Sequence, residues 1–169
     1  TGRGADTVEI VRPQVTCNIL KTKKFNVNDE ITKPYFELEN VKRGVFSLAT
    51  RLYGLNFKKV NIPVYHKDVE GWEVTDAKGK YVALLYTDFH PRAGKRAGAW
   101  MTEYKGQWKD GKKDSRPHIT IVMNFTEPTK DKPALLTFDE VETFLHEFGH
   151  AIHGMVTECT YYSLSGTNV

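Results

Sequence analysis

The chain has 169 residues, of which 40% are hydrophobic, 12% aromatic and 27% charged. These proportions are typical of a soluble globular protein, and the length suits one domain. Lys and Arg number 24 against 21 Asp and Glu, which gives a net charge of +3. So small a charge does not favour charge-driven disorder or a nucleic-acid-binding field over the whole surface. No apolar run approaches the roughly 18 residues of a membrane span, so we expect no membrane partner.

The two cysteines, Cys17 and Cys159, lie far apart and form no CxxC pair. We expect both to be reduced thiols, which suits a cytoplasmic location. A periplasmic location stays open, because the chain begins at Thr1 and its native N-terminus is not visible. Residues 1–17 lack a clear apolar period and predict an irregular lead-in.

The first predicted elements are helical. Asn28, Asp29 and Glu30 indicate a short helix that stops at Pro34. Apolar residues then repeat at spacings of three and four, which predicts an amphipathic helix from residue 38 to residue 52, ended by Gly54. Its apolar positions are Leu38, Val41, Val45, Leu48, Ala49 and Leu52.

The middle of the chain predicts a small antiparallel sheet with short connections. Pro63 favours an edge position for the first of its strands, and residues 76–79 form a turn that ends in Gly79. The polar stretch 105–116 predicts a solvated hairpin loop. The expected strands are residues 60–64, 70–76, 80–89, 97–104 and 118–125.

The last third predicts a long helix. Thr137 and Glu140 are spaced as a capping box, and about twenty residues follow with one apolar side. The fold class is therefore α+β: a small antiparallel sheet with flanking helices and one long helix. The expected apolar side of that helix comprises Val141, Phe144, Leu145, Phe148, Ile152, Met155 and Val156.

This helix carries an HExxH motif at residues 146–150. His146 and His150 are four residues apart and share one helix face, so both imidazoles can reach one Zn²⁺ ion at about 2.0–2.1 Å. Glu147 lies about 100° away from His146 around the helix, which suits a general base better than a ligand. We therefore predict a zinc site with His146 and His150 as ligands and Glu147 as the catalytic base.

Two further residues on or near this helix are possible ligands. His153 lies near the same face, but three ligands on one helix would strain the geometry, so we expect it to orient a ligand or to lie on the substrate side. Glu158 lies two turns beyond His150, near the expected helix end. The metzincin pattern fails, because it requires a glycine at His153 and a histidine at Val156.

Several motifs agree on one family. Residues 133–150 resemble the zinc oligopeptidase family, which contains thimet oligopeptidase, oligopeptidase A and bacterial peptidyl-dipeptidase (dipeptidyl carboxypeptidase). The resemblance covers residues 18–169, and residues 150–154 and 164–168 are more similar to the peptidyl-dipeptidase branch. Segments 34–38, 51–54, 65–69 and 98–101 resemble the family in the same order.

The resemblance implies one zinc ion and a third ligand, a glutamate about 29 residues after His146, which is beyond Val169. It also places the residues that stabilise the oxyanion further downstream, so we expect Tyr161 and Tyr162 only to pack a turn. Residues 18–169 are then a partial catalytic domain that needs the rest of its polypeptide. Two histidines alone hold zinc weakly, so we expect the isolated chain to be a poor peptidase.

The expected activity is release of C-terminal dipeptides from short peptides, with an oligopeptidase-type endopeptidase as the alternative within the family. Gly98 and Ala99 are candidates for substrate binding, if they lie on an edge strand that pairs with peptide main chain. The opposing interpretation is an inner strand with Trp100 in the core. His153 is a third candidate on the substrate side.

Two readings outside this family stay open. Basic residues and Trp108 crowd residues 105–116, which is compatible with a non-catalytic binding domain for nucleic acid. A solvated loop tip explains them better, because Asp110 and Asp114 dilute the charge, and we expect no nucleic-acid partner. The other reading is a structural domain in which the motif histidines are incidental.

Overall fold

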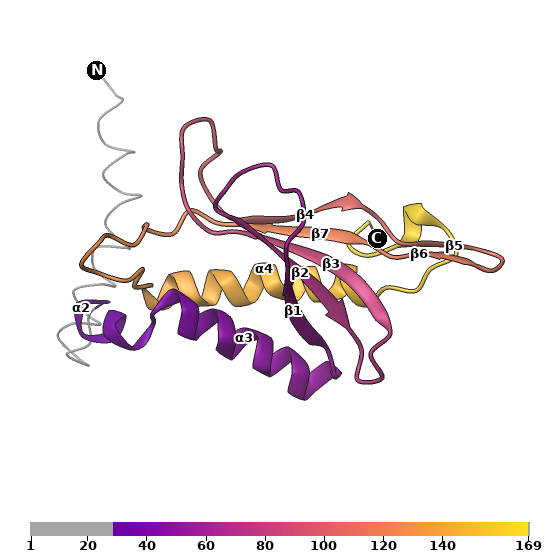
Figure 1. Cartoon of the computed structure of the whole chain (residues 1–169), viewed down its shortest axis with the longest axis horizontal. Coiled ribbons are helices and arrows are strands. Elements are labelled where there is room, and N and C mark those ends of the chain that lie inside the picture. The colour runs from indigo at the N-terminus through magenta and orange to yellow at the C-terminus, as the bar shows by residue number, and fades with distance from the viewer. Residues whose placement is uncertain (1–28, 169) are drawn as a thin grey trace, which may run out of the picture.

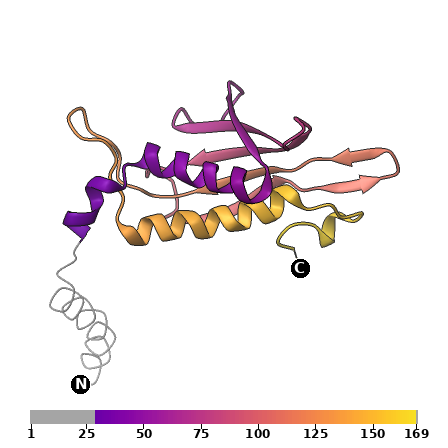
Figure 2. The same cartoon turned by 90° about the horizontal axis from the view of Figure 1, so that it is seen from below.

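The computed structural model describes residues 29–168, so the predicted lead-in over residues 1–17 and Cys17 lie outside the described residues. The described part begins with α2 (Asp29–Thr32), which ends two residues before Pro34, and the 3-10 helix η1 (Lys33–Tyr35), which contains it. Two long helices lie side by side on one face of a sheet (Figures 1 and 2). They are α3 (Leu38–Tyr53) and α4 (Phe138–Val156).

The sheet has five strands in the order β1-β2-β3-β7-β4. A separate two-stranded sheet, β5-β6, extends beyond β4 and β7 (Figure 1). A second 3-10 helix, η2 (Tyr162–Leu164), follows α4. The strands are β1 (Asn56–Val60), β2 (Val69–Thr75), β3 (Tyr81–Asp88), β4 (Trp100–Lys105), β5 (Trp108–Asp110), β6 (Lys113–Ser115) and β7 (His118–Val122).

The α+β class and both long helices are confirmed, but the sheet is mixed and not wholly antiparallel. Strands β3 and β7 run parallel, while every other neighbouring pair is antiparallel. The cause is the connection after β3: residues 89–99 carry the chain to the outer edge, and β7 then returns between β3 and β4. A simple meander cannot describe this path, because consecutive strands β3 and β4 are not neighbours.

One local expectation was wrong, and another was only partly right. The first strand is β1 at Asn56–Val60, four residues earlier than residues 60–64, and Pro63 lies in the following loop. The hairpin expected within residues 105–116 is confirmed as the pair β5–β6, but the segment is not wholly solvated, because Gln107 is fully buried. The side chain of Gln107 explains this: it bonds the N–H of Cys159 at 2.8 Å and the carbonyl of Cys159 at 3.1 Å.

Helix α3 buries part of the predicted apolar face, because Leu38, Val45 and Ala49 are buried as expected, but two predicted positions are not. Leu48 and Leu52 are 43% and 63% exposed, whereas Lys42 and Phe46 are buried. Phe46 stacks on Phe57 of β1 with ring centroids 4.4 Å apart, which turns the helix toward that strand. The helix ends as expected at Gly54, whose φ of 68° lies in the left-handed region that favours glycine.

Helix α4 begins with the predicted capping box. The Thr137 hydroxyl accepts from the Glu140 N–H at 3.2 Å, and the Glu140 carboxylate accepts from the Thr137 N–H at 2.7 Å. Phe144, Phe148 and Met155 pack into the core between helices and sheet, whereas Leu145 and Val156 stay largely exposed. The packing of this face against the sheet fixes which side of α4 is left open.

Candidate active site

The two motif histidines lie on the open side of α4 and converge. His146 and His150 are both exposed, and their Nε2 atoms are 3.1 Å apart, with ring centroids separated by 4.7 Å. Two imidazole nitrogens on a tetrahedral zinc, each at about 2.0–2.1 Å, lie about 3.3 Å from each other. The spacing of the two Nε2 atoms therefore fits two ligands of a single zinc ion.

Glu147 lies beside this pair. Its side chain is half-buried and makes no hydrogen bond or ion pair with any residue from 29 to 168. It lines a cavity of about 450 Å³ together with His146, Ala99, Glu142 and Thr143. A carboxylate without a partner at the wall of a cavity is free to accept a proton from a molecule inside it.

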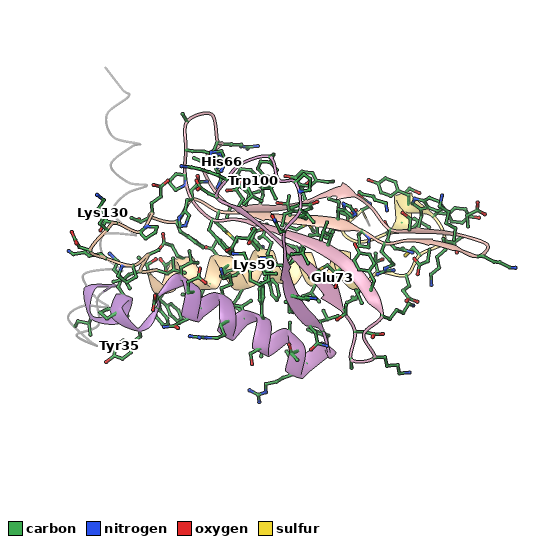
Figure 3. All side chains as sticks on the ribbon, in the orientation of Figure 1. Tyr35, Lys59, His66, Glu73, Trp100 and Lys130 are labelled. Carbon is green, nitrogen blue, oxygen red and sulfur yellow. The ribbon has the colours of Figure 1, made fainter. Side chains whose placement is uncertain are left out.

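The opposite wall of this cavity is the start of the edge strand. Strand β4 is the last strand of the five-stranded sheet, so the alternative in which this segment is an inner strand is wrong. Gly98 and Ala99 directly precede β4, and Trp100, labelled in Figure 3, is its first residue. The structure thus brings Ala99 together with His146 and Glu147, whereas Gly98 does not line the cavity.

The hydrogen bonds of β7 show which main-chain groups face the open edge. Met123 and Phe125 donate their N–H groups toward β3, to the carbonyls of Asp88 and Phe89, at 2.8 Å each. Alternate residues of β7 therefore point toward β4, including Val122, which pairs with Trp100. It follows that Trp100 turns its main-chain groups to β7 and that Ala99 turns its own to the free edge.

In the described part of the chain, no third side chain joins the two histidines to form a metal-binding group. No group of three His, Cys, Asp or Glu that could hold a metal ion occurs among residues 29–168. Glu158 lies beyond the end of α4 and bonds Lys109 at 3.1 Å, which lowers the pKa of the Glu158 carboxyl. His153 is exposed in the last turn of α4 and does not join the pair.

Glu103 on β4 is a charged residue beside the last turn of α4 that the sequence patterns do not indicate. Burial raises the pKa of the Glu103 carboxyl, while the electrostatic interaction with His153 opposes the rise. Its Oε1 atom is buried without a hydrogen-bond partner in the described structure. Glycines leave room for it: a Cβ at Gly154 would lie 3.1 Å from this oxygen, and one at Gly166 would lie closer still. No local pattern could reveal Glu103, because these neighbours are distant in sequence.

The other two residues of the cavity on α4 follow from the helical period of the sequence. Glu142 and Thr143 lie one helical turn before His146 and Glu147, so the helical period places them on the same side of α4.

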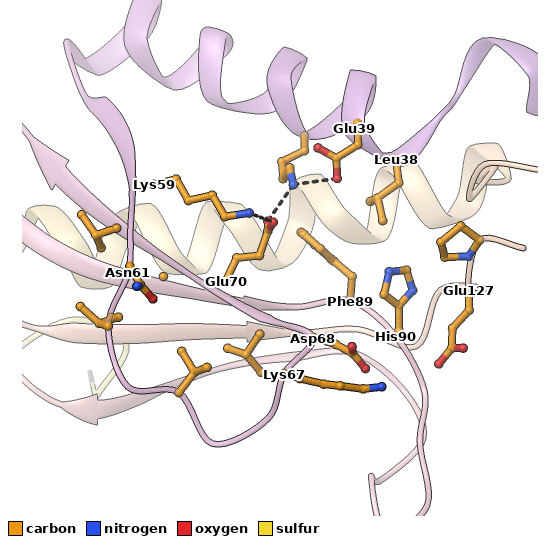
Figure 4. Close-up of a pocket in the computed structure, with 17 residues that line it drawn as sticks. Leu38, Glu39, Lys59, Asn61, Lys67, Asp68, Glu70, Phe89, His90 and Glu127 are labelled. Carbon is orange, nitrogen blue, oxygen red and sulfur yellow. Dashed lines mark hydrogen bonds and ion pairs between the residues drawn. The ribbon is translucent and has the colours of Figure 1, made fainter. Parts of the chain in front are cut away.

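A larger cavity of about 950 Å³ lies away from the motif, between the start of α3 and the residues between β1 and β2 (Figure 4). Its buried cation is Lys42, which donates to the carboxylates of Glu39 at 2.8 Å and Glu70 at 2.7 Å. Burial disfavours ionisation of Glu70, but hydrogen bonds from Lys42 and Lys59 outweigh it and lower the Glu70 pKa. Because these charges neutralise one another, volume alone does not make this cavity the reaction site.

The basic residues of 105–116 are partly used inside the fold. The Arg116 guanidinium donates to the carbonyls of Met155 at 2.6 Å, Val82 at 2.7 Å and Thr157 at 3.1 Å. Lys113 lies over the Trp108 ring, with its Nζ atom 5.1 Å from the ring centre. The side chain of Tyr162 lies against Gly106, where any Cβ would clash with its ring, which agrees with a packing role.

Comparison with known proteins gives a consistent result. Residues 16–169 match the family model described as Peptidase family M3. The dipeptidyl carboxypeptidase of Escherichia coli is 43% identical over 151 residues, which are 88% of this chain and 22% of that protein. Oligopeptidase A of the same organism is 36% identical over 86% of this chain and 22% of its own length. The organellar oligopeptidase A of Arabidopsis thaliana is 40% identical over 82% of this chain and 18% of its length. The chain thus spans about a fifth of the length of these curated relatives.

Proposed function

Because the chain belongs to peptidase family M3, we propose that it is the part of a zinc metallopeptidase that supplies two zinc ligands, the general base and an edge strand for the substrate. The observation that carries the proposal is the pair of converging nitrogens, 3.1 Å apart, beside the unpartnered carboxylate of Glu147. The described residues offer only two ligands, so the proposal assigns the third to the remainder of a longer polypeptide.

The reaction is hydrolysis of a peptide bond: water adds to the carbonyl carbon, the C–N bond breaks, and an acid and an amine are released. Zinc in this site would supply Lewis acidity, which polarises the carbonyl and acidifies water. Glu147 accepts the proton of the attacking water and passes it to the leaving nitrogen. One carboxylate serves both steps, because it is deprotonated before the first and regenerated by the second.

The substrate would be a short, extended peptide that adds to the free edge of β4. Its main chain would bond the N–H and C=O groups of Ala99, while Gly98 leaves space for close approach. His153 would lie further along α4, on the substrate side. Release of C-terminal dipeptides is favoured over internal cleavage, because the dipeptidyl carboxypeptidase is the more similar of the two E. coli relatives, at 43% against 36% identity.

The chain by itself should hold zinc weakly. A zinc ion bound by two histidines would fill its other positions with water, which gives low affinity. We therefore expect little peptide cleavage from the 169-residue chain alone and efficient cleavage from the longer protein that contains it. Vigorous, chelator-sensitive cleavage by the purified chain would contradict the assignment of a third ligand elsewhere.

The deciding experiment compares two variants of the longer protein. Glu147→Gln should keep bound zinc but lower kcat by about 10²–10⁴-fold, because the general base is lost. His146→Ala should lose the zinc as well. The measurements are zinc content after gel filtration and release of dipeptides from a short peptide. Normal turnover in Glu147→Gln, or equal zinc in both variants, would refute the assigned roles.

A non-catalytic domain that binds nucleic acid through residues 105–116 is the remaining alternative. It is the weaker proposal, because Arg116 and Lys109 already bond groups within the fold. Retardation of short oligonucleotides at low salt, abolished at high salt, would favour it.

A further inference from the structure

Residues 96–98, which lead into the edge strand β4, are held by a side chain that lies just after the end of β7. Asn124 follows β7 by two residues, and the pairing of Val122 with Trp100 continues to place it opposite Gly98. Its Nδ2 group donates to the Gly98 carbonyl at 2.7 Å and to the Arg96 carbonyl at 3.0 Å. The regular pairing of β4 with β7 ends at Trp100 and Val122. Beyond that pair, the side chain of Asn124 supplies the hydrogen bonds that tie the two segments together.

Gly98 needs such a restraint. Its φ is 100°, a conformation that L side chains rarely adopt, and a Cβ there would meet nothing within 4 Å. The segment is therefore not held by side-chain packing at this position. With Gly98 bonded to Asn124, the next residue, Ala99, is left with its main-chain groups toward the free edge and its side chain at the cavity of His146 and Glu147.

The other end of the same segment is fixed by a buried polar cluster at the end of β3. Asp88 is 1% exposed and accepts two hydrogen bonds from Arg92, at 2.8 and 2.9 Å. The Lys95 ammonium, 3% exposed, bonds the Asp88 carboxylate at 2.9 Å and the His90 carbonyl at 2.6 Å. Residues 88–95 are thus fixed independently, and Asn124 holds the remaining stretch up to Ala99.

We propose that Asn124 is a positioning residue for peptide binding: its amide holds residues 96–98 so that the main-chain groups of Ala99 meet the substrate at the edge of the site. This inference rests on the proposed peptidase function. Asn124 itself does not line the cavity and does not touch the motif residues. Its effect is therefore expected on substrate binding and not on proton transfer.

The test uses the longer zinc-loaded protein and a short peptide with a series of analogues, each N-methylated at one amide. In the wild type, methylation of the amide that pairs with the edge strand should raise KM by about 5–10-fold, the effect of one lost hydrogen bond. Asn124→Ala should raise KM for the unmodified peptide by a similar factor and leave kcat within about twofold. In this variant the same methylation should cost almost nothing, because the hydrogen bond is already lost.

Asn56→Ala is the matched control. The Asn56 amide also donates to a main-chain carbonyl, that of Asp76 at 3.2 Å, but it lies on β1 at the opposite edge of the sheet. In Asn56→Ala, the KM for the unmodified peptide and the rise in KM caused by N-methylation should both equal those of the wild type. Asn124→Asp removes the donor and sets a carboxylate against the same two carbonyls, so it should raise KM at least as much as Asn124→Ala. A kcat within about twofold of the wild type shows that a variant is folded.

An unchanged methylation penalty in both Asn124 variants would overturn the proposal, as would a fall in kcat with KM unchanged. These results differ from failure of the proposed function, in which the wild type releases no dipeptide or Glu147→Gln turns over normally.

Discussion

Helices α3 and α4 lie on the same face of the sheet, but α3 buries a polar side chain with charged partners, whereas α4 leaves its two motif histidines exposed. On α3, Lys42 is 5% exposed and bonds the carboxylates of Glu39 and Glu70. On α4, His146 and His150 are exposed, and each finds no hydrogen-bond partner except the other among residues 29–168. A buried polar group without a partner costs about 1–3 kcal/mol, so the arrangement on α3 is what stability demands. The arrangement on α4 stabilises nothing and leaves two nitrogens ready for a ligand.

Removal of a motif histidine should have the largest effect, and it tests whether the exposed pair on α4 serves metal binding and not stability. In the longer protein, His150→Ala should lower zinc affinity by about 10³-fold or more, since loss of a residue that merely orients a ligand costs about 10–100-fold. The unfolding free energy of the zinc-free protein should change by less than about 0.5 kcal/mol, because the side chain is exposed. Competition with a chromogenic chelator and urea unfolding measure the two quantities. Unchanged zinc affinity in His150→Ala would show that the exposed histidines of α4 do not bind the metal.

The corresponding change on α3 should act on stability alone. Lys42→Met should lower the unfolding free energy by about 2–3 kcal/mol, because Glu70 stays half-buried with only Lys59 to neutralise it. Zinc affinity should not move. Arg43→Ala, at an exposed position next along α3, is the control and should lie within about 0.5 kcal/mol of the wild type. Equal urea midpoints for Lys42→Met and Arg43→Ala would contradict the structural role of Lys42.

The stability of the fold at low pH should depend on a second buried polar group, the carboxylate of Asp88. Burial disfavours the charge of Asp88, but hydrogen bonds from Arg92, Lys95 and Tyr65 outweigh it and lower the Asp88 pKa from 3.8 to about 2. A lowered pKa stabilises the fold above the unfolded value and loses that effect as the pH falls through the folded value, here between about pH 4 and pH 2. This shift corresponds to at most about 2.5 kcal/mol of stability. Burial also lowers the pKa of Lys95, which opposes the pairing, so the net contribution is smaller.

The measurement is the difference in unfolding free energy between wild type and Asp88→Asn at several pH values. The difference should be constant above about pH 4 and shrink toward pH 2. Asp110→Asn, at an exposed position in the β5–β6 hairpin, provides the control. A difference that is independent of pH would show that Asp88 is not held ionised by its partners.

The smallest expected effect concerns the start of α4. Thr137→Ala removes the hydroxyl that accepts from the Glu140 N–H and should lower the unfolding free energy by about 1 kcal/mol. The zinc affinity should stay the same, because the motif lies more than two turns further along the helix. Thr129→Ala, in the exposed loop before α4, should leave the urea midpoint unchanged. A midpoint for Thr137→Ala equal to that control would show that the cap contributes nothing.

Prediction from sequence succeeded where the signal was local. The capping box at Thr137, the left-handed glycine after α3 and the convergence of His146 with His150 all depend on residues within one or two helical turns. It failed where a distant element chose the outcome. The spacing of apolar residues on α3 favoured Leu48 and Leu52 as core, but the position of β1 and β2 buried Phe46 and Lys42 in their place.

The amino-acid sequence by itself thus determined the two long helices, the HExxH face and the family to which the chain belongs. Only the tertiary structure decided the order of the strands, in which β7 separates β3 from β4 and leaves β4 at the edge. It also decided that Ala99 meets Glu147 and that Asn124 meets Gly98. The physical reason is that helical geometry fixes which residues share a face over a few positions, whereas strand order depends on pairing between segments that the sequence keeps apart.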